Sequence, residues 1–116
     1  MKADVTALLE GRRRELNERL ATVEAQLLAI REARSGATDD DEHDPEGSTL
    51  SLEWSRAEGR HADVLREFAD LAAAEARLAE GTYGVCASCG RAIPLERLRL
   101  MPAATLCVPC ASAQGR

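Results

Sequence analysis

The residues best suited to chemistry in this sequence are its four cysteines, which form two Cys-x-x-Cys pairs: Cys86 with Cys89, and Cys107 with Cys110. Seventeen residues separate the pairs. The short spacing within a pair lets two thiolates approach one ion from the same turn, and two such turns complete a tetrahedral sulfur site for zinc. Since protein ligands fill all four positions, no place remains for water or substrate. The sequence predicts one structural Zn²⁺ ion.

The alternative for these cysteines is a redox-active dithiol or a pair of disulfides. A redox Cys-x-x-Cys usually lies in a βαβ context, and this sequence shows no such pattern. No apolar run approaches the roughly 20 residues needed to span a bilayer, and the first residues lack the apolar stretch of a secretory signal. We therefore expect a cytoplasmic protein with no membrane partner, in which reduced thiols bind metal.

Other kinds of chemistry are not indicated. The sequence contains no nucleophile–base pair, phosphate-binding glycine loop or open metal site, so we expect a protein that is not an enzyme. Its formal net charge of -5 argues against a protein that coats nucleic acid, which needs a basic face. We expect no direct sequence-specific DNA binding.

Two long helices are expected to precede the cysteines. Between Val5 and about Arg34 the apolar residues step by fours and threes, as in a coiled coil. These first-helix seam residues are Leu9, Leu16, Leu20, Val23, Leu27 and Ile30. A second stripe, with Ser48 or Thr49 as the helix cap, runs to about Glu80, where Gly81 and Gly84 end the helix. Its seam residues are Leu50, Trp54, Ala57, His61, Val64, Phe68, Leu71, Glu75 and Leu78, widened by Leu65, Ala72 and Ala79.

A short polar connection between these helices favours an antiparallel hairpin, because it cannot let the second helix run parallel to the first. We predict a mostly α fold: residues 1–80 form a long two-helix coiled-coil hairpin with an acidic tip loop at 35–48, and residues 81–116 form a small C4 zinc-finger module. An intermolecular coiled coil remains the alternative, and we expect a monomer or a weak dimer. The module has few large apolar residues, so zinc binding must supply its folding energy.

The residues around the cysteines resemble the zinc finger of the DksA/TraR family. The resemblance starts with the run YGVCASCG at 83–90 and ends with the second cysteine pair. Between them it is carried by Ile93, Arg97, Leu98, Pro102, Ala104 and Leu106. The resemblance covers residues 81–111 and, more loosely, the helical hairpin. It implies a bacterial transcription regulator that binds RNA polymerase, inserts its coiled coil through the secondary channel and holds acidic tip residues near the active-site magnesium.

The tip residues implied by the resemblance lie in the acidic loop, in one of two registers. One register places the acidic positions of the family's D-x-x-D-x-A pattern at Asp41 and Asp44, and the other places them at Asp39 and Glu42. The basic residues that DksA-type members use for ppGpp correspond here to Met101 and Ala111, which implies that a site of that type is absent.

Four arginines are candidate partner contacts. Arg66 lies on the second helix, and Arg91, Arg97 and Arg99 make the finger locally basic. The arginines of the finger are equally suited to offset the negative charge of zinc bound by four thiolates. The rival function, from a different class, is a zinc-stabilised helical adaptor or dimerisation module without polymerase activity.

Overall fold

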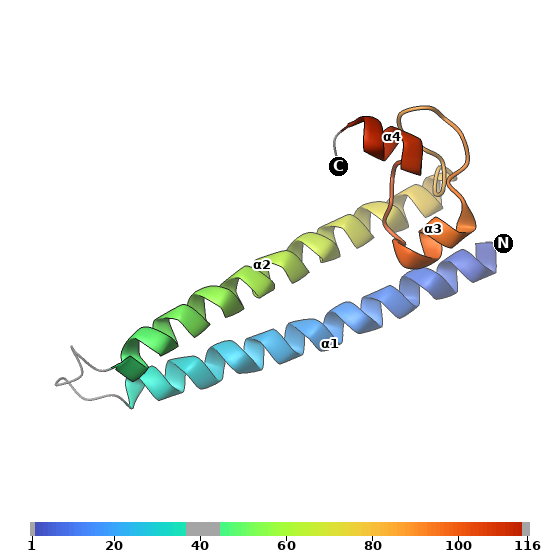
Figure 1. Cartoon of the computed structure of the whole chain (residues 1–116). Coiled ribbons are helices and arrows are strands. Elements are labelled where there is room, and N and C mark those ends of the chain that lie inside the picture. Colours follow the sequence, from blue (N-terminus) through green and yellow to red (C-terminus); the bar gives the residue numbers. More distant parts are fainter. Residues whose placement is uncertain (1, 37–44, 115–116) are drawn as a thin grey trace. The chain divides into compact units, whose positions relative to one another are not determined.

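The computed structural model describes residues 2–36 and 45–114 (Figure 1). The elements are α1 (Lys2–Ser35), α2 (Pro45–Glu80), α3 (Leu95–Leu100) and α4 (Val108–Ala113). In the described residues the only pairing of extended backbone is one antiparallel bridge between Val85 and Ala92. The predicted mostly α fold, with two long helices that pack together, is confirmed.

The helix boundaries correct one detail of the prediction. The end of α2 at Glu80 is confirmed, but its predicted cap at Ser48 or Thr49 is wrong, because the helix already begins at Pro45. Proline suits a first helical turn, where its missing N–H would have no partner within the helix. The range predicted for the loop, 35–48, overlaps both helices, since α1 includes Ser35 and α2 includes residues 45–48.

The chain divides into two compact units, of which one comprises residues 15–67. In this unit the predicted seam is buried: Leu16, Val23 and Ile30 of α1, together with Ala57 and Val64 of α2, form its core. Within each helix these buried residues are seven positions apart, which is the repeat of a coiled-coil seam. Leu65, which was expected to widen the stripe, is 48% exposed, so that prediction is wrong.

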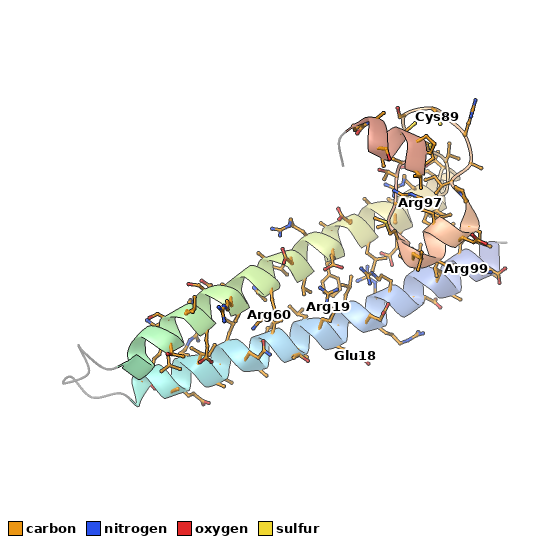
Figure 2. The ribbon with its side chains drawn as sticks, in the orientation of Figure 1. Glu18, Arg19, Arg60, Cys89, Arg97 and Arg99 are labelled. Carbon is orange, nitrogen blue, oxygen red and sulfur yellow. The ribbon has the colours of Figure 1, made fainter. Side chains whose placement is uncertain are left out.

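Polar contacts across the same unit establish that α1 and α2 run antiparallel, as predicted. Arg19 binds Glu67 through two hydrogen bonds of 3.0 and 2.6 Å, and Arg60 donates to Gln26 at 2.9 Å (Figure 2). Further along α1, the guanidinium of Arg31 lies 5.8 Å from the ring centre of Trp54. As residue numbers rise along α1, the numbers of the contacting residues on α2 therefore fall. Trp54 therefore lies near the C-terminal end of α1.

The second unit comprises residues 1–14 and 68–116. Its helical part buries Val5 and Leu9 of α1 with Leu71 and Ala74 of α2. Ala72 and Ala79 were expected at the interface but are exposed, so this prediction is also wrong. The three consecutive alanines at 72–74 do not differ in hydrophobicity. Only the packing of the helices determines that Ala74 is the buried one, with no exposed surface.

A charged pair replaces apolar packing at one point of this unit. Arg13 and Glu75 both occupy seam positions, and the guanidinium binds the carboxylate through bonds of 3.2 and 2.6 Å. The guanidinium also lies 5.8 Å from the ring centre of Phe68. The hydrogen bond to Glu75 raises the pKa of Arg13. Each of these two polar seam residues therefore finds its hydrogen-bond partner in the other. The pair favours the observed register of α1 against α2, because a shifted register would separate the two charges.

Across the part of the chain that the structure describes, no helix combines the length and the apolar character required to traverse a lipid bilayer.

Candidate metal centre

The metal centre begins where α2 ends. Gly81 has a positive φ of 84°, its N–H donates to Leu78, and the N–H of Thr82 reaches back to the carbonyl of Arg77 at 2.9 Å. These two bonds form a Schellman motif, which satisfies carbonyls left open at the helix end. The chain reverses there and enters the first cysteine pair.

The first pair lies in a tight turn. The N–H of Gly90 donates to the carbonyl of Cys86 at 3.0 Å, and the N–H of Cys86 donates to Arg91 at 2.8 Å. Gly90 adopts a φ of 77°, a left-handed conformation that costs most residues energy. The turn brings the side chains of Cys86 and Cys89 to the same side.

The second pair lies at the start of α4. Cys107 is the N-cap residue, Pro109 occupies the first turn, and the N–H of Ala111 donates to the carbonyl of Cys107 at 2.9 Å. This turn of helix places Cys110 beside Cys107. Helix α4 was not predicted from the sequence, although a proline two residues after a candidate cap is a recognisable signal for a helix start.

The four predicted ligands are brought together. The Sγ atoms of Cys86, Cys89, Cys107 and Cys110 all lie within 4.8 Å of one another, and those of Cys89 and Cys107 are 3.8 Å apart. Zinc–sulfur bonds of about 2.3 Å in a tetrahedron require sulfurs about 3.8 Å apart. All four cysteines are free, in agreement with the prediction against disulfides. The donor set fits one structural zinc ion.

The thiols are not equivalent. Backbone hydrogen bonds from Cys107 and Cys89 lower the pKa of Cys86 to about 6. Hydrogen bonds with the sulfurs of Cys107 and Cys86 raise the pKa of Cys110 to about 12. Four sulfurs this close therefore resist complete ionisation, and a cation among them favours the deprotonated form of all four.

A small apolar cluster supports the site. Ile93 and Leu98 are buried with the ligands Cys86 and Cys107, and Leu8 of α1 packs against them. The hydroxyl of Tyr83 donates to the carbonyl of Pro102 at 2.6 Å and thereby links the start of the finger to the segment between α3 and α4. Each of these side chains gains its neighbours only when the cysteine pairs are held together.

The arginines predicted as partner contacts have different surroundings. Arg66 pairs with Asp63 on the surface of α2, and Arg91 and Arg99 are exposed. Arg97 is half-buried, and its Nε donates to the carbonyl of Leu106 at 2.8 Å (Figure 2). Contacts of these residues with a partner stay a prediction, but Arg97 has a structural role that the sequence did not reveal: its hydrogen bond holds the segment that leads into Cys107.

We expect Arg97→Leu to weaken the finger. The substitution removes a charge-assisted hydrogen bond and leaves the carbonyl of Leu106 without this donor, a loss of about 1.5–3 kcal/mol. Competition with a chromophoric chelator should show a correspondingly lower zinc affinity. Arg99→Leu, on the exposed face of the same helix, is the matched control, and equal losses in both variants would contradict the role of Arg97.

Two glycines should respond oppositely to alanine. Gly90→Ala places a side chain at a φ of 77° and should cost roughly 1–2 kcal/mol in the zinc-loaded finger, measured by chelator competition. Gly59→Ala, in the interior of α2 with no atom within 4 Å of the added carbon, should stabilise the protein by roughly 0.5–1 kcal/mol in urea. Stabilisation by both substitutions would show that the first turn does not need glycine.

The predicted tip residues Asp39, Asp41, Glu42 and Asp44 lie outside the described residues.

The fold and the metal centre define a helical-hairpin protein with a C4 zinc finger. Residues 81–114 match the family model of the prokaryotic dksA/traR C4-type zinc finger. Residues 81–114 therefore form a C4 zinc finger of the dksA/traR type. Among solved structures, that of transcription factor DksA2 from Pseudomonas aeruginosa has 24% sequence identity and a TM-score of 0.76, over 97% of this chain and 84% of that chain. No curated protein matches the sequence.

Proposed function

We propose that this protein is a DksA-like transcription regulator that binds RNA polymerase. In this proposal the hairpin enters the secondary channel, its acidic residues act near the active site, and the zinc finger is structural. The observation that carries the proposal is a DksA/TraR finger in a chain whose fold resembles that of DksA2 along nearly its whole length.

The charge distribution supports the same proposal. The segment between α1 and α2, residues 36–44, contains five acidic residues and no lysine or arginine. Such a concentration of carboxylates attracts a basic pore or a divalent cation. By contrast, the cysteine site leaves no ligand position for substrate, so the regulatory action is assigned to the acidic segment and not to zinc.

Binding is tested by co-purification with core RNA polymerase at micromolar protein and low salt. We expect association, and its absence would contradict the proposal. The role of the acidic segment is tested separately by a fourfold alanine variant, which should retain binding and alter transcription from a responsive promoter. The residues replaced are Asp39, Asp41, Glu42 and Asp44.

A charge-matched variant provides the control for the loss of four negative charges. It replaces four exposed helical acids, which we expect to leave transcription unchanged because they lie outside the acidic segment. These residues are Glu10, Glu58, Asp70 and Glu80. Equal effects of the two variants would indicate a response to net charge and would count against a specific tip.

A second candidate, a helical adaptor or dimerisation module, is favoured by one observation. Leu28, Leu52 and Leu65 are 53%, 51% and 48% exposed in the unit of residues 15–67, outside the buried seam. Sedimentation equilibrium distinguishes the candidates. A stable dimer that is dissociated by Leu52→Lys and that fails to bind polymerase would support the adaptor.

A further inference from the structure

An apolar cavity borders the apolar cluster of the finger in the unit of residues 1–14 and 68–116. Its volume is about 470 Å³, within the range of roughly 300–1,000 Å³ typical of small-molecule sites. α1, α2 and the finger all contribute to its wall. The principal side chains are Val5, Leu78, Tyr83, Val85, Ile93 and Leu98.

The wall offers no charge and few polar groups. None of the lining residues has a charged side chain, and the hydroxyl of Tyr83 already donates to Pro102. The backbone N–H of Val85 donates to Thr82 at 3.3 Å, and that of Ile93 donates to the carbonyl of Gly84 at 2.7 Å. A ligand in this cavity therefore meets mainly apolar side chains, and the N–H groups of Val85 and Ile93 are already engaged.

The uncharged, mainly apolar wall favours some classes of ligand over others. A phosphorylated or carboxylated ligand would lose hydration without gaining a cation, which is costly for a charged group. An extended peptide would bring N–H and C=O groups that need partners, and the N–H groups of Val85 and Ile93 are already engaged. An uncharged apolar compound loses little hydration and gains contact with the leucine, valine and isoleucine side chains.

We propose that this cavity binds an uncharged, predominantly apolar small molecule. Val85 directly precedes Cys86, Tyr83 lies two residues before Val85, and Ile93 follows the turn that contains Cys89. The wall is thus complete only when zinc has folded the finger. The ligand should therefore bind the zinc-loaded protein and stabilise the contacts between the finger and the first turns of α1. This proposal is independent of polymerase binding.

The test uses the full-length, zinc-loaded protein and a pair of fluorescent probes. N-phenylnaphthylamine is uncharged and apolar, and anilinonaphthalene sulfonate carries the same rings with an anionic group. We expect saturable binding of one uncharged probe per chain, with the sulfonated probe on the order of tenfold weaker.

Two tryptophan variants locate the binding. Val85 lines the cavity and is 44% exposed, whereas Val108 is 54% exposed, does not line it and likewise adjoins a zinc ligand. Val85→Trp should fill the cavity and weaken binding of the uncharged probe on the order of tenfold. Val108→Trp should bind it like the wild type. The zinc content of both variants is measured to confirm that the finger is folded.

Several outcomes would overturn the proposal. They are absence of saturable binding, equal binding by the two folded variants, and equal affinity for the sulfonated probe. Self-association that only Val85→Trp abolishes would assign the cavity to a second copy of the chain. Loss of polymerase association in Val85→Trp, without loss of probe binding, would assign this face to a protein partner. If Val85→Trp fails to retain zinc, Leu95→Trp replaces it, since Leu95 also lines the cavity.

Discussion

Removal of zinc is expected to unfold residues 81–114 and to loosen the first turns of α1. The apolar cluster of the finger contains only Ile93, Leu98 and two of the ligands as buried members, which is too little to fold a segment of this size. Structural zinc contributes an apparent free energy of about 10–16 kcal/mol in isolated zinc fingers at neutral pH. Leu8 of α1 loses its packing partners when the cluster dissolves.

Hydrogen exchange measured by mass spectrometry, before and after chelation, provides the test. Amides of residues 81–114 should become unprotected, and those of residues 2–14 should exchange faster. Residues 16–30, whose core belongs to the other unit, serve as the internal control and should remain protected. Metal-free protein that keeps full protection in the finger would show that its fold does not depend on zinc.

Leu16→Ala should destabilise the unit of residues 15–67 by about 2–5 kcal/mol. The Leu16 side chain has no exposed surface, so alanine removes buried apolar contact and leaves a cavity at the helix interface. The free energy of unfolding is measured by urea denaturation of the zinc-loaded protein, followed by far-UV circular dichroism.

Leu28→Ala is the matched control because it makes the same chemical change in the same helix and the same unit. Leu28 is 53% exposed, and its replacement should alter stability by no more than about 0.5 kcal/mol. Similar losses in the two variants would mean that the seam does not determine stability, or that Leu28 is buried in an assembly.

The sequence predicted the helical seam well wherever leucine, valine or isoleucine alternated with charged residues. Leu16, Val23 and Ile30 are buried as expected, because such residues lose much hydration at a helix interface. The prediction failed where that contrast was weak or misleading. Ala72 and Ala74 are alike in hydrophobicity, and Leu65 lies beside the buried Val64, so only the rotation of α2 against α1 distinguishes them.

Contacts between residues that are far apart along the chain could not be predicted from the sequence. Glu75 was recognisable as a polar residue in the predicted seam, but its partner Arg13 lies 62 positions away along the chain. Arg97 was predicted as a partner contact because it is one of several basic residues in the finger. Its bond to the carbonyl of Leu106 became visible only when α3 was placed against the second cysteine pair.

The zinc site could be predicted from the amino-acid sequence because the residues that determine it lie close together within each cysteine pair. Each Cys-x-x-Cys pair needs only one turn to aim two sulfurs, and four thiolates within 4.8 Å complete a site whose chemistry depends on ligand type. The apolar cavity, the charged pair in the seam and the burial of Ala74 had no local signature. They arise from the register in which α1, α2 and the finger pack, and this register minimises the energy of many weak contacts between residues that are remote along the chain.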